Sequence, residues 1–515
     1  MPPTTYAYNA RDQLTQSSQS RQTRTFEYDG HGRLWRKTTP EQGPTTYLYN
    51  ADDTVQQVTD ARGAAASYSY NSRHLPASIN YTVPGGVAQT PNVTFTYDEA
   101  GNRTQMTDGL GSVAYTYDTL SRLTAEARTF TGLSGARTLN YTYNLGGQLS
   151  RSSNSWSAAQ VAYAYNRAGE LSAIQGTNTS GQPTYGGVSN YRHGMAYRAF
   201  GGLKQALSGD VRVLTLGYDN RLRLSSWQVS GAQSWTYHYD RFGENTGRVT
   251  YAVNNFDATL NRSYDYDHAG RLWEAHSGNE ADAHAAGQGF GGTPNGPFSH
   301  SYRYDQHGNM TYRVGWGGWN GAYVDWTQSY TNNRRNGWAY DTAGNVTNDG
   351  GQTFTYDAAG RQATASSNGI QHHYDGDGLR GKKVEDGYTT YYLRSSVLGG
   401  QVIGELNASG GWSRGYVYAG WEQVAVQQSG FVYWTHTDPI TKSQRVTFNS
   451  STIASTVDMD PWGGETQRSS NQNLQPHRYA TYERDANGSD YAQARQYHGY
   501  QMRFDQPDGG VRYFV

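Results

Sequence analysis

Carboxylates are the most numerous side chains here that could do chemistry, since the chain contains 43 Asp and Glu residues. Two of them placed on either side of a glycosidic bond would make a glycoside hydrolase. Many of the Asp residues, however, follow a Tyr and stand three residues before a Gly, as Asp98 does between Tyr97 and Gly101. An Asp at that place accepts hydrogen bonds from the backbone that follows it, and Gly tolerates a positive φ. The regular placement therefore favours a turn-forming role over catalysis.

Two short stretches have residue types that can bind metal ions. Asp375-Gly376-Asp377-Gly378 begins like a calcium loop but lacks the later oxygen ligands, so we expect a turn. His372 and His373 are adjacent, which would place them on opposite faces of a strand, a poor geometry for one ion. Cysteine is absent, which excludes disulfides and thiolate metal sites. No metal site, no cofactor and no known catalytic motif is therefore predicted.

Tryptophans are concentrated among glycines between residues 312 and 338. Trp316, Trp319 and Trp326 could form a surface on which sugar rings stack. Large rings can equally fill a wide gap in a sheet, because Trp is ordinary core material. We favour the packing interpretation and keep glycan stacking as the alternative.

The elements that must position these residues are short repeats. Aromatic residues alternate with small polar ones, as in Phe95-Thr96-Tyr97, and this alternation is typical of a half-buried strand. Strand, turn and strand together make a β-hairpin. A single hairpin cannot bury its own face, so we expect the hairpins to join into one curling sheet with the aromatic rings on one face. The first steps of the repeat are 20, 21 and 21 residues, and the Tyr-Asp or Tyr-Asn marker occurs at Tyr8, Tyr28, Tyr49, Tyr70, Tyr97, Tyr117, Tyr143, Tyr165, Tyr218, Tyr239, Tyr266, Tyr304, Tyr340, Tyr356 and Tyr374.

Three departures from this rhythm carry predictions of their own. At Tyr197 the Asp of the marker is replaced by Arg198, so we expect a turn without the carboxylate cap. Residues 274–297 are rich in Gly and Ala and are predicted to form an exposed loop. Beyond Tyr374 the marker disappears, although strands continue. We therefore divide the chain into a hairpin ribbon, residues 1–380, and a second β-rich region, residues 381–515.

Composition excludes two classes of partner. The formal net charge is -1 and the sequence has no Lys/Arg-rich run, which argues against binding to nucleic acid. No apolar stretch approaches the roughly 18 residues of a membrane span. The first residues have neither the basic nor the apolar region of a signal peptide, and they begin almost inside a repeat, so we expect the start to be a truncation.

The phrase Tyr-Asp-x-x-Gly-Arg-Leu resembles the YD repeat of RHS proteins. Good copies are residues 28–34 and 266–272, and the resemblance extends over about residues 6–508. The last part also resembles the RHS repeat-associated core, through residues 436–446, 460–466 and 482–508. The resemblance implies an all-β fold of spiralling β-hairpins, a curled sheet that forms a shell or an incomplete cocoon. Such shells enclose a toxic C-terminal segment, their end plugs the cavity, and they are secreted or displayed at the cell surface.

In many RHS proteins the end of the shell is also an aspartyl autoprotease that frees the toxin. The resemblance assigns Arg495 and Asp508 to two of its positions. The second catalytic Asp belongs to a downstream segment that is absent here, and the Pro expected after the first Asp is Gly509. Because aspartyl hydrolysis needs two carboxylates that share a proton, we expect this set to be incomplete and the chain not to cut itself. Arg495 and Asp508 are then expected to form an ion pair or a turn cap.

Two functions from different classes follow from these observations. The first is a non-catalytic shell or shell fragment of a toxin-delivery protein, without leader or cargo, whose partners would be a toxin polypeptide or a complementary shell chain. The second is an extracellular repeat protein that binds carbohydrates on a cell surface. A closed particle that protects an added polypeptide from protease would favour the first. Glycan binding that is lost on replacing Trp316 and Trp319 would favour the second.

Overall fold

Antiparallel β-hairpins make up nearly all of the described chain in the computed structural model. It describes residues 3–154, 160–176, 185–241, 244–245, 247–317, 321–450 and 452–508. The predicted all-β fold of repeated hairpins is confirmed. None of the helices in these ranges is long and apolar enough to cross a membrane.

The first sheet has 27 strands, and we call it the wall. Each strand pairs antiparallel with the strand before it, as β2 pairs with β3 and β3 with β4. The strands of the wall are β1 (Thr4–Tyr8), β2 (Leu14–Gln19), β3 (Gln22–Tyr28), β4 (Leu34–Thr39), β5 (Gly43–Tyr49), β6 (Val55–Thr59), β7 (Ala65–Tyr70), β8 (Pro76–Thr82), β9 (Val93–Tyr97), β10 (Arg103–Asp108), β11 (Gly111–Tyr117), β12 (Leu123–Phe130), β13 (Arg137–Tyr143), β14 (Leu149–Asn154), β15 (Val161–Tyr165), β16 (Leu171–Gly176), β17 (Asn190–Tyr197), β18 (Leu203–Ser208), β19 (Val213–Tyr218), β20 (Leu224–Val229), β21 (Gln233–His238), β24 (Tyr251–Asn254), β25 (Arg262–Tyr266), β26 (Leu272–Ser277), β27 (Phe298–Tyr304), β28 (Met310–Gly317) and β29 (Tyr323–Thr327).

The turn between β3 and β4 shows how the repeated motif builds a hairpin. Asp29 Oδ1 accepts hydrogen bonds of 2.9 Å from the backbone N–H groups of His31 and Arg33. Gly32 has a φ of 86°, the left-handed value that ends such a turn in a bulge. The Arg33 side chain donates to Asp29 Oδ2 and lies over the ring of Tyr49, 4.6 Å from its centre, in the next hairpin. The predicted turn-forming role of the repeated Asp is confirmed.

The marker Tyr ties each hairpin to the one before it. The Tyr49 hydroxyl donates to the backbone carbonyl of Leu34 at 2.7 Å. The same bond from Tyr hydroxyl to carbonyl occurs in the pairs Tyr28–Leu14, Tyr70–Val55, Tyr97–Pro76, Tyr117–Arg103, Tyr143–Leu123, Tyr165–Leu149, Tyr197–Leu171, Tyr218–Leu203, Tyr239–Leu224, Tyr266–Val249, Tyr304–Leu272, Tyr356–Val346 and Tyr374–Gln362. Hairpin stacking therefore has a polar component as well as a packed aromatic face.

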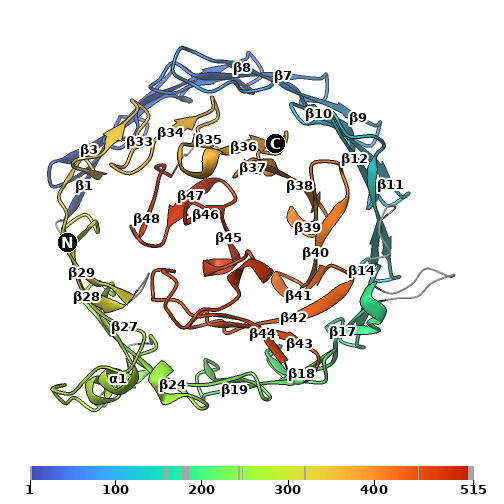
Figure 1. The fold of residues 1–515 in the computed structure, drawn as a ribbon. Helices are drawn as coiled ribbons and strands as arrows, with labels where there is room; N and C mark the ends of the chain where they lie inside the picture. The colour runs from blue at the N-terminus through green and yellow to red at the C-terminus, as the bar shows by residue number, and fades with distance from the viewer. Residues whose placement is uncertain are drawn as a thin grey trace.

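The wall curves into a ring, and the chain then continues inside that ring (Figure 1). The ring returns to its start where Gln306 bonds to Ser20 at 2.9 Å and Gln22 bonds to Asn333 at 2.8 Å. Side chains make these contacts. The sheet is therefore an open spiral whose two ends meet through side-chain hydrogen bonds and not through paired strands. A long twisted sheet is expected to curl in this way.

A second sheet of 11 strands lies within the ring, and we call it the inner turn (Figure 1). Its strands are β34 (Phe354–Tyr356), β35 (Gln362–Ala365), β36 (Ile370–Tyr374), β37 (Arg380–Glu385), β38 (Tyr388–Ser395), β39 (Gln401–Leu406), β40 (Trp412–Ala419), β41 (Glu422–Gln428), β42 (Phe431–Thr437), β43 (Gln444–Phe448) and β44 (Thr452–Val457). This sheet continues across residues 380 and 381, so the division placed there stays a prediction.

A four-stranded sheet ends the described chain, also within the ring, and we call it the plug (Figure 1). Its strands are β45 (Glu483–Arg484), β46 (Ser489–Ala492), β47 (Arg495–His498) and β48 (Arg503–Phe504). The remaining described elements are short. They are β22 (Asp240–Arg241), β23 (Glu244–Asn245), β30 (Tyr330–Thr331), β31 (Arg334–Arg335), β32 (Ala339–Tyr340), β33 (Val346–Asn348) and the 3-10 helices Tyr185–Gly187, Ala258–Leu260, Ser367–Gly369, Gln472–Leu474 and Tyr479–Thr481.

The prediction that residues 274–297 form an exposed loop is wrong for part of the segment. The segment begins inside β26 and continues as helix α1 (Gly278–Ala285), whose Ala281 is fully buried. Helix α1 packs against β25 and β26 and projects from the outside of the ring (Figure 1). A helix of two turns is too short to show a clear helical period in the sequence, so the Gly/Ala-rich composition indicated a loop.

Candidate functional site

Buried ion pairs join the wall to the inner turn and the segment that follows it. Arg262 on β25 pairs with Asp458, and Arg313 on β28 pairs with Asp460 at 2.9 Å. All four side chains are at most 1% exposed. Burial raises the pKa of Asp460, although the Arg313 cation acts against this. Removing one partner of such a pair would leave a buried charge uncompensated, so these contacts fix where the segment after the inner turn meets the wall.

Further polar contacts repeat this arrangement around the ring. They include the Gly376 N–H donating to Asp108, Ser396 donating to Glu126, Arg192 with Glu422, and Tyr237 with Asp438. Aromatic packing accompanies them, since Trp462 and Met502 pack against a wall cluster that contains Tyr264 and Tyr302. The face that carries these rings is therefore the inner face of the wall.

Four buried charges bring the inner turn against the plug. Arg380 lies 2.7 Å from Asp485 and 2.8 Å from Glu483, and Lys383 lies 2.8 Å from Asp485 and 3.1 Å from Glu483. Burial alone would raise the pKa of Asp485, but the Arg380 and Lys383 cations hold it well below its ordinary value. His372 adds a contact to Asp485 at 3.3 Å. No motif in the sequence indicates this cluster, because its two halves are about 100 residues apart.

The charge cluster borders a polar cavity of about 670 Å³, lined in part by Glu405, Arg414 and Glu465. A second cavity, of about 470 Å³, lies between the wall and the inner turn, with Glu126 and Arg128 on one side and Asp375 and Arg394 on the other. Volumes of this order suit water and small molecules. A folded domain of 100 residues has a radius of gyration of about 13 Å and fits in neither.

The two residues assigned by resemblance to an autoprotease lie near each other. Arg495 Nη1 is 3.8 Å from Asp508 Oδ1, and the Asp508 side chain is 89% exposed. The Arg495 guanidinium also lies over the ring of Phe504, 3.9 Å from its centre. Aspartyl catalysis needs two carboxylates that share a proton, whereas the charge facing Asp508 here is a guanidinium. The geometry agrees with the predicted ion pair, and the lack of catalysis stays a prediction.

A buried carboxylate near Asp508 belongs to Asp505, which the sequence did not single out. Its Oδ2 lies 3.0 Å from His498 Nε2 and accepts a bond of 3.1 Å from Gln362 of the inner turn. Burial favours a neutral His498 ring, but the Asp505 charge raises the pKa of His498 above its ordinary value. These contacts fasten β47 to the inner turn.

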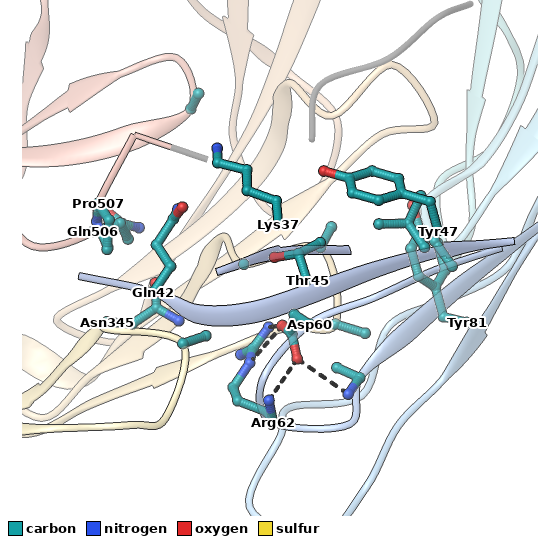
Figure 2. A pocket seen from close by; sticks show the side chains of 18 of the residues that line it. Lys37, Gln42, Thr45, Tyr47, Asp60, Arg62, Tyr81, Asn345, Gln506 and Pro507 are labelled. Carbon is teal, nitrogen blue, oxygen red and sulfur yellow. Dashed lines mark hydrogen bonds and ion pairs between the residues drawn. The ribbon is translucent and has the colours of Figure 1, made fainter. Parts of the chain in front are cut away.

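Figure 2 shows the small cavity where the plug meets the wall. Lys37, Gln42 and Tyr47 come from the wall, and Gln506 and Pro507 come from the end of the plug. Arg495 lines the same cavity, and Gln42 donates to the Asp508 carbonyl at 3.1 Å. Its volume of about 110 Å³ gives room for a few water molecules. The cavity therefore marks a seam between two parts of the fold.

Two of the three tryptophans proposed for glycan stacking, Trp316 and Trp326, do not share one face of the sheet. Trp316 pairs with Tyr323, and Trp326 pairs with Arg313, three positions away from Trp316 on β28. Because side chains alternate along a strand, Trp316 and Trp326 lie on opposite faces of the wall. Both are half-buried, and Trp319 lies outside the described residues. Glycan stacking stays an untested prediction.

Two predictions about His and Asp residues near 375 are confirmed. His372 is buried and His373 is exposed, so the adjacent rings do point to opposite faces. Asp375 Oδ1 accepts bonds from the backbone N–H groups of Asp377 and Leu379, which is the same turn cap as in the wall. Burial, together with the Asp377 charge, raises the pKa of Asp375 to about 6.

Comparison with known proteins matches both the repeat and the architecture. The family model described as Teneurin YD-shell matches residues 2–134. The solved structure of TcdB2-TccC3 superposes with a TM-score of 0.79 at 16% identity, covering 98% of this chain and 29% of that chain. The form without the hypervariable C-terminal region gives a TM-score of 0.78, and the Photorhabdus luminescens Tc holotoxin pore gives 0.76, each at 16% identity with 98% of this chain and 28% of that chain covered. A comparison with curated proteins found no match.

The spiral of hairpins and its superposition over almost the whole chain define the class as a β-shell. The family model matches the Tyr-Asp repeat of the first hairpins, and the superposition shows the shell fold over almost the whole chain, which agrees with the predicted resemblance. The chain spans less than a third of the length of the structures it matches.

Proposed function

We propose that this chain is the wall and end-plug of a larger shell that encloses a toxin polypeptide. The observation that supports this most directly is that the inner turn and plug lie within the ring, and that the segment joining them is tied to the wall by the buried ion pairs Arg262–Asp458 and Arg313–Asp460. Separating these ion pairs would leave buried charges unpaired, which is energetically costly. Such pairs therefore help to keep a shell closed. The matching shells are found in structures described as TcdB2-TccC3 complexes and a Tc holotoxin pore.

The partner we propose is a polypeptide held beyond the plug, with a complementary shell chain or further shell sequence completing the enclosure. The three cavities described above, of about 110, 470 and 670 Å³, are each too small for a folded polypeptide. A cargo would therefore contact the face of the plug and the open end of the ring. With such a role we expect the protein to act outside the producing cell, secreted or at its surface.

The chain is non-catalytic in this proposal. Arg495 and Asp508 make an exposed ion pair, and we expect no cleavage at the end of the plug. Intact mass spectrometry of the purified chain should give the full-length mass, unchanged over days and identical in behaviour for the Asp508→Asn variant. A shorter species that forms in the wild type and not in that variant would show that the chain processes itself.

Enclosure is tested with a protease-sensitive reporter peptide fused after residue 515 and with the shell assembled with its complementary chain. The reporter should survive protease while the same reporter, added free to the same particles, is degraded. Equal degradation of both reporters by intact particles would overturn the proposal. We do not propose glycan binding, since Trp316 and Trp326 lie on opposite faces of the wall.

A further inference from the structure

Two imidazoles and a carboxylate meet on the outer face of the wall, beneath helix α1. Glu274 and His276 lie two residues apart on β26 and therefore share a face. His284 reaches the same point from α1. His276 Nε2 is 3.6 Å and His284 Nε2 is 3.8 Å from Glu274 Oε2, and the donor atoms all lie within 4.8 Å of one another.

The fourth donor comes from the neighbouring strand. Asp265 on β25 stands directly opposite Glu274 in the strand pairing. Its Oδ2 is 3.2 Å from His284 Nε2. Four ligands at about 2.0–2.2 Å from a tetrahedral zinc ion are separated from one another by roughly 3.3–3.6 Å. Three of the observed separations are 3.2–3.8 Å, and the donor atoms of Glu274, His276 and His284 lie within 4.8 Å of one another, so the side chains would have to close up around a bound ion.

The Nδ1 atom of each imidazole already has a hydrogen-bond partner. His276 Nδ1 lies 2.8 Å from the Ser299 hydroxyl, and His284 Nδ1 lies 2.9 Å from the Ser263 hydroxyl. Ser299 in turn donates to Glu280 at 2.7 Å. Metal-binding histidines are oriented in this way, with one nitrogen fixed by a hydrogen bond and the other directed at the ion. The two Nε2 atoms are thus aimed at the same carboxylate before any ion arrives.

The charge of the cluster also suits a cation. Asp265, Glu274 and Glu280 place three carboxylates around two imidazoles, and the ion pairs seen for Glu274 and Glu280 are with those rings. An imidazole balances a carboxylate only while it is protonated. A divalent ion would supply the positive charge without that condition. Both rings are largely shielded, at 12% and 15% exposure, so the ion would be partly protected from water.

We propose that Glu274, His276, His284 and Asp265 form a zinc-class metal site that fastens α1 to the outside of the wall. Imidazole nitrogens and carboxylate oxygens are ligands that Zn²⁺ accepts in tetrahedral sites. Three of the ligands stand on two paired strands and the fourth on the helix. Metal binding would therefore tie α1 to the wall. It would not depend on the inner turn or on a cargo.

The test uses the full chain without a histidine tag, stripped of metal and titrated with Zn²⁺ by calorimetry and with Co²⁺ by absorption spectroscopy. We expect one ion per chain, visible bands of tetrahedral cobalt, and slower hydrogen exchange in α1 once metal is bound. His276→Ala and His284→Ala should each weaken binding at least tenfold, and Ser299→Ala should weaken it by about tenfold. His74→Ala, an exposed histidine paired with Asp52 on another part of the wall, is the matched control and should bind normally.

Glu274→Gln keeps the shape of the side chain and guards against the case in which a His variant fails to fold. It should retain the wild-type circular dichroism spectrum and lose metal affinity. The proposal is overturned if the stripped chain binds no Zn²⁺ at micromolar concentration. It is equally overturned if Glu274→Gln and the two His variants bind as tightly as the His74→Ala control.

Discussion

The Tyr97 hydroxyl donates a 2.8 Å hydrogen bond to the backbone carbonyl of Pro76, in the hairpin that precedes its own. Burial raises the pKa of Tyr97, which keeps the hydroxyl in its donating form. The same bond recurs around the wall and explains why the repeat uses Tyr where Phe would pack equally well. A backbone carbonyl in each hairpin accepts a hydrogen bond from the Tyr hydroxyl of the next hairpin. Strand pairing and hairpin stacking are therefore coupled.

Replacing Tyr97 with Phe tests this coupling. The change removes one hydrogen bond and leaves the Pro76 carbonyl short of a partner, so we expect a loss of about 1 kcal/mol in local stability. Hydrogen exchange in β8 and β9 should become faster by roughly fivefold. Tyr388→Phe, at a residue that is 79% exposed, is the control and should have little effect. Unchanged exchange in Tyr97→Phe would mean that ring packing alone joins the hairpins.

The repeated Asp is predicted to be replaceable by Asn. Asn9 and Asn71 already occupy this position in other hairpins and accept the same two backbone hydrogen bonds. Asp29→Asn should therefore lose only the ion pair with Arg33 and lower the melting temperature very little. Asp29→Ala should lower it more, because two backbone donors lose their acceptor. Thermal melts of the two variants measure the difference, and equal destabilisation would contradict the turn-cap role.

The buried charge cluster should be intolerant of losing one cation. Lys383→Met removes one of the two cations that pair with Glu483 and Asp485, and we expect a cost of about 3–5 kcal/mol. Lys204→Met, at an exposed position on β18, should stay within about 0.5 kcal/mol of the wild type. Because the pKa of Asp485 is lowered in the fold, the stabilisation is present above about pH 4 and is lost as the pH falls further. A Lys383→Met variant as stable as Lys204→Met would show that the cluster does not hold the plug.

His498 should give the plug a pH dependence of the opposite sign. Its pKa is raised in the folded chain by Asp505, so its contribution is fully present below about pH 6.5 and is lost as the pH rises through the folded value. Hydrogen exchange in β46 and β47 should accelerate over that range, with a slope of at most about 1.4 kcal/mol per pH unit from this one group. His498→Gln should remove the slope, whereas exposed His31→Gln should keep it. A slope that survives in His498→Gln would assign it to another group.

The hairpins were predictable from the sequence because their causes are local. Asp98, Gly101 and the alternation of Phe95 with Tyr97 act within a few residues, and each acts as expected in the fold. The degenerate copy at Tyr197 is instructive, because its turn closes through backbone bonds between Arg198 and Gly202 although the carboxylate is missing. Strand register and hairpin stacking hold this turn in place without the carboxylate cap.

The contacts that place the inner turn and plug were not predictable, because they join residues far apart in the chain. Arg262 meets Asp458 after almost 200 residues, and nothing near either residue indicates the partner. Helix α1 was missed for a different reason, since Gly and Ala dominate a segment too short to show a helical period. The cluster of Glu274 and His276 with His284 was missed with it, because its ligands converge only once that helix folds back on the wall.

The radius of gyration in solution tests the central claim, that one chain forms both a ring-shaped wall and the plug within it. A compact chain of this length should have a radius of gyration of about 24 Å. A flat ribbon of 27 strands spaced about 4.8 Å apart would be about 130 Å long, with a radius of gyration of at least about 37 Å. Small-angle X-ray scattering on the monomeric chain should give the lower value. A value near or above 37 Å would contradict the wall-and-plug architecture and the enclosing function proposed from it.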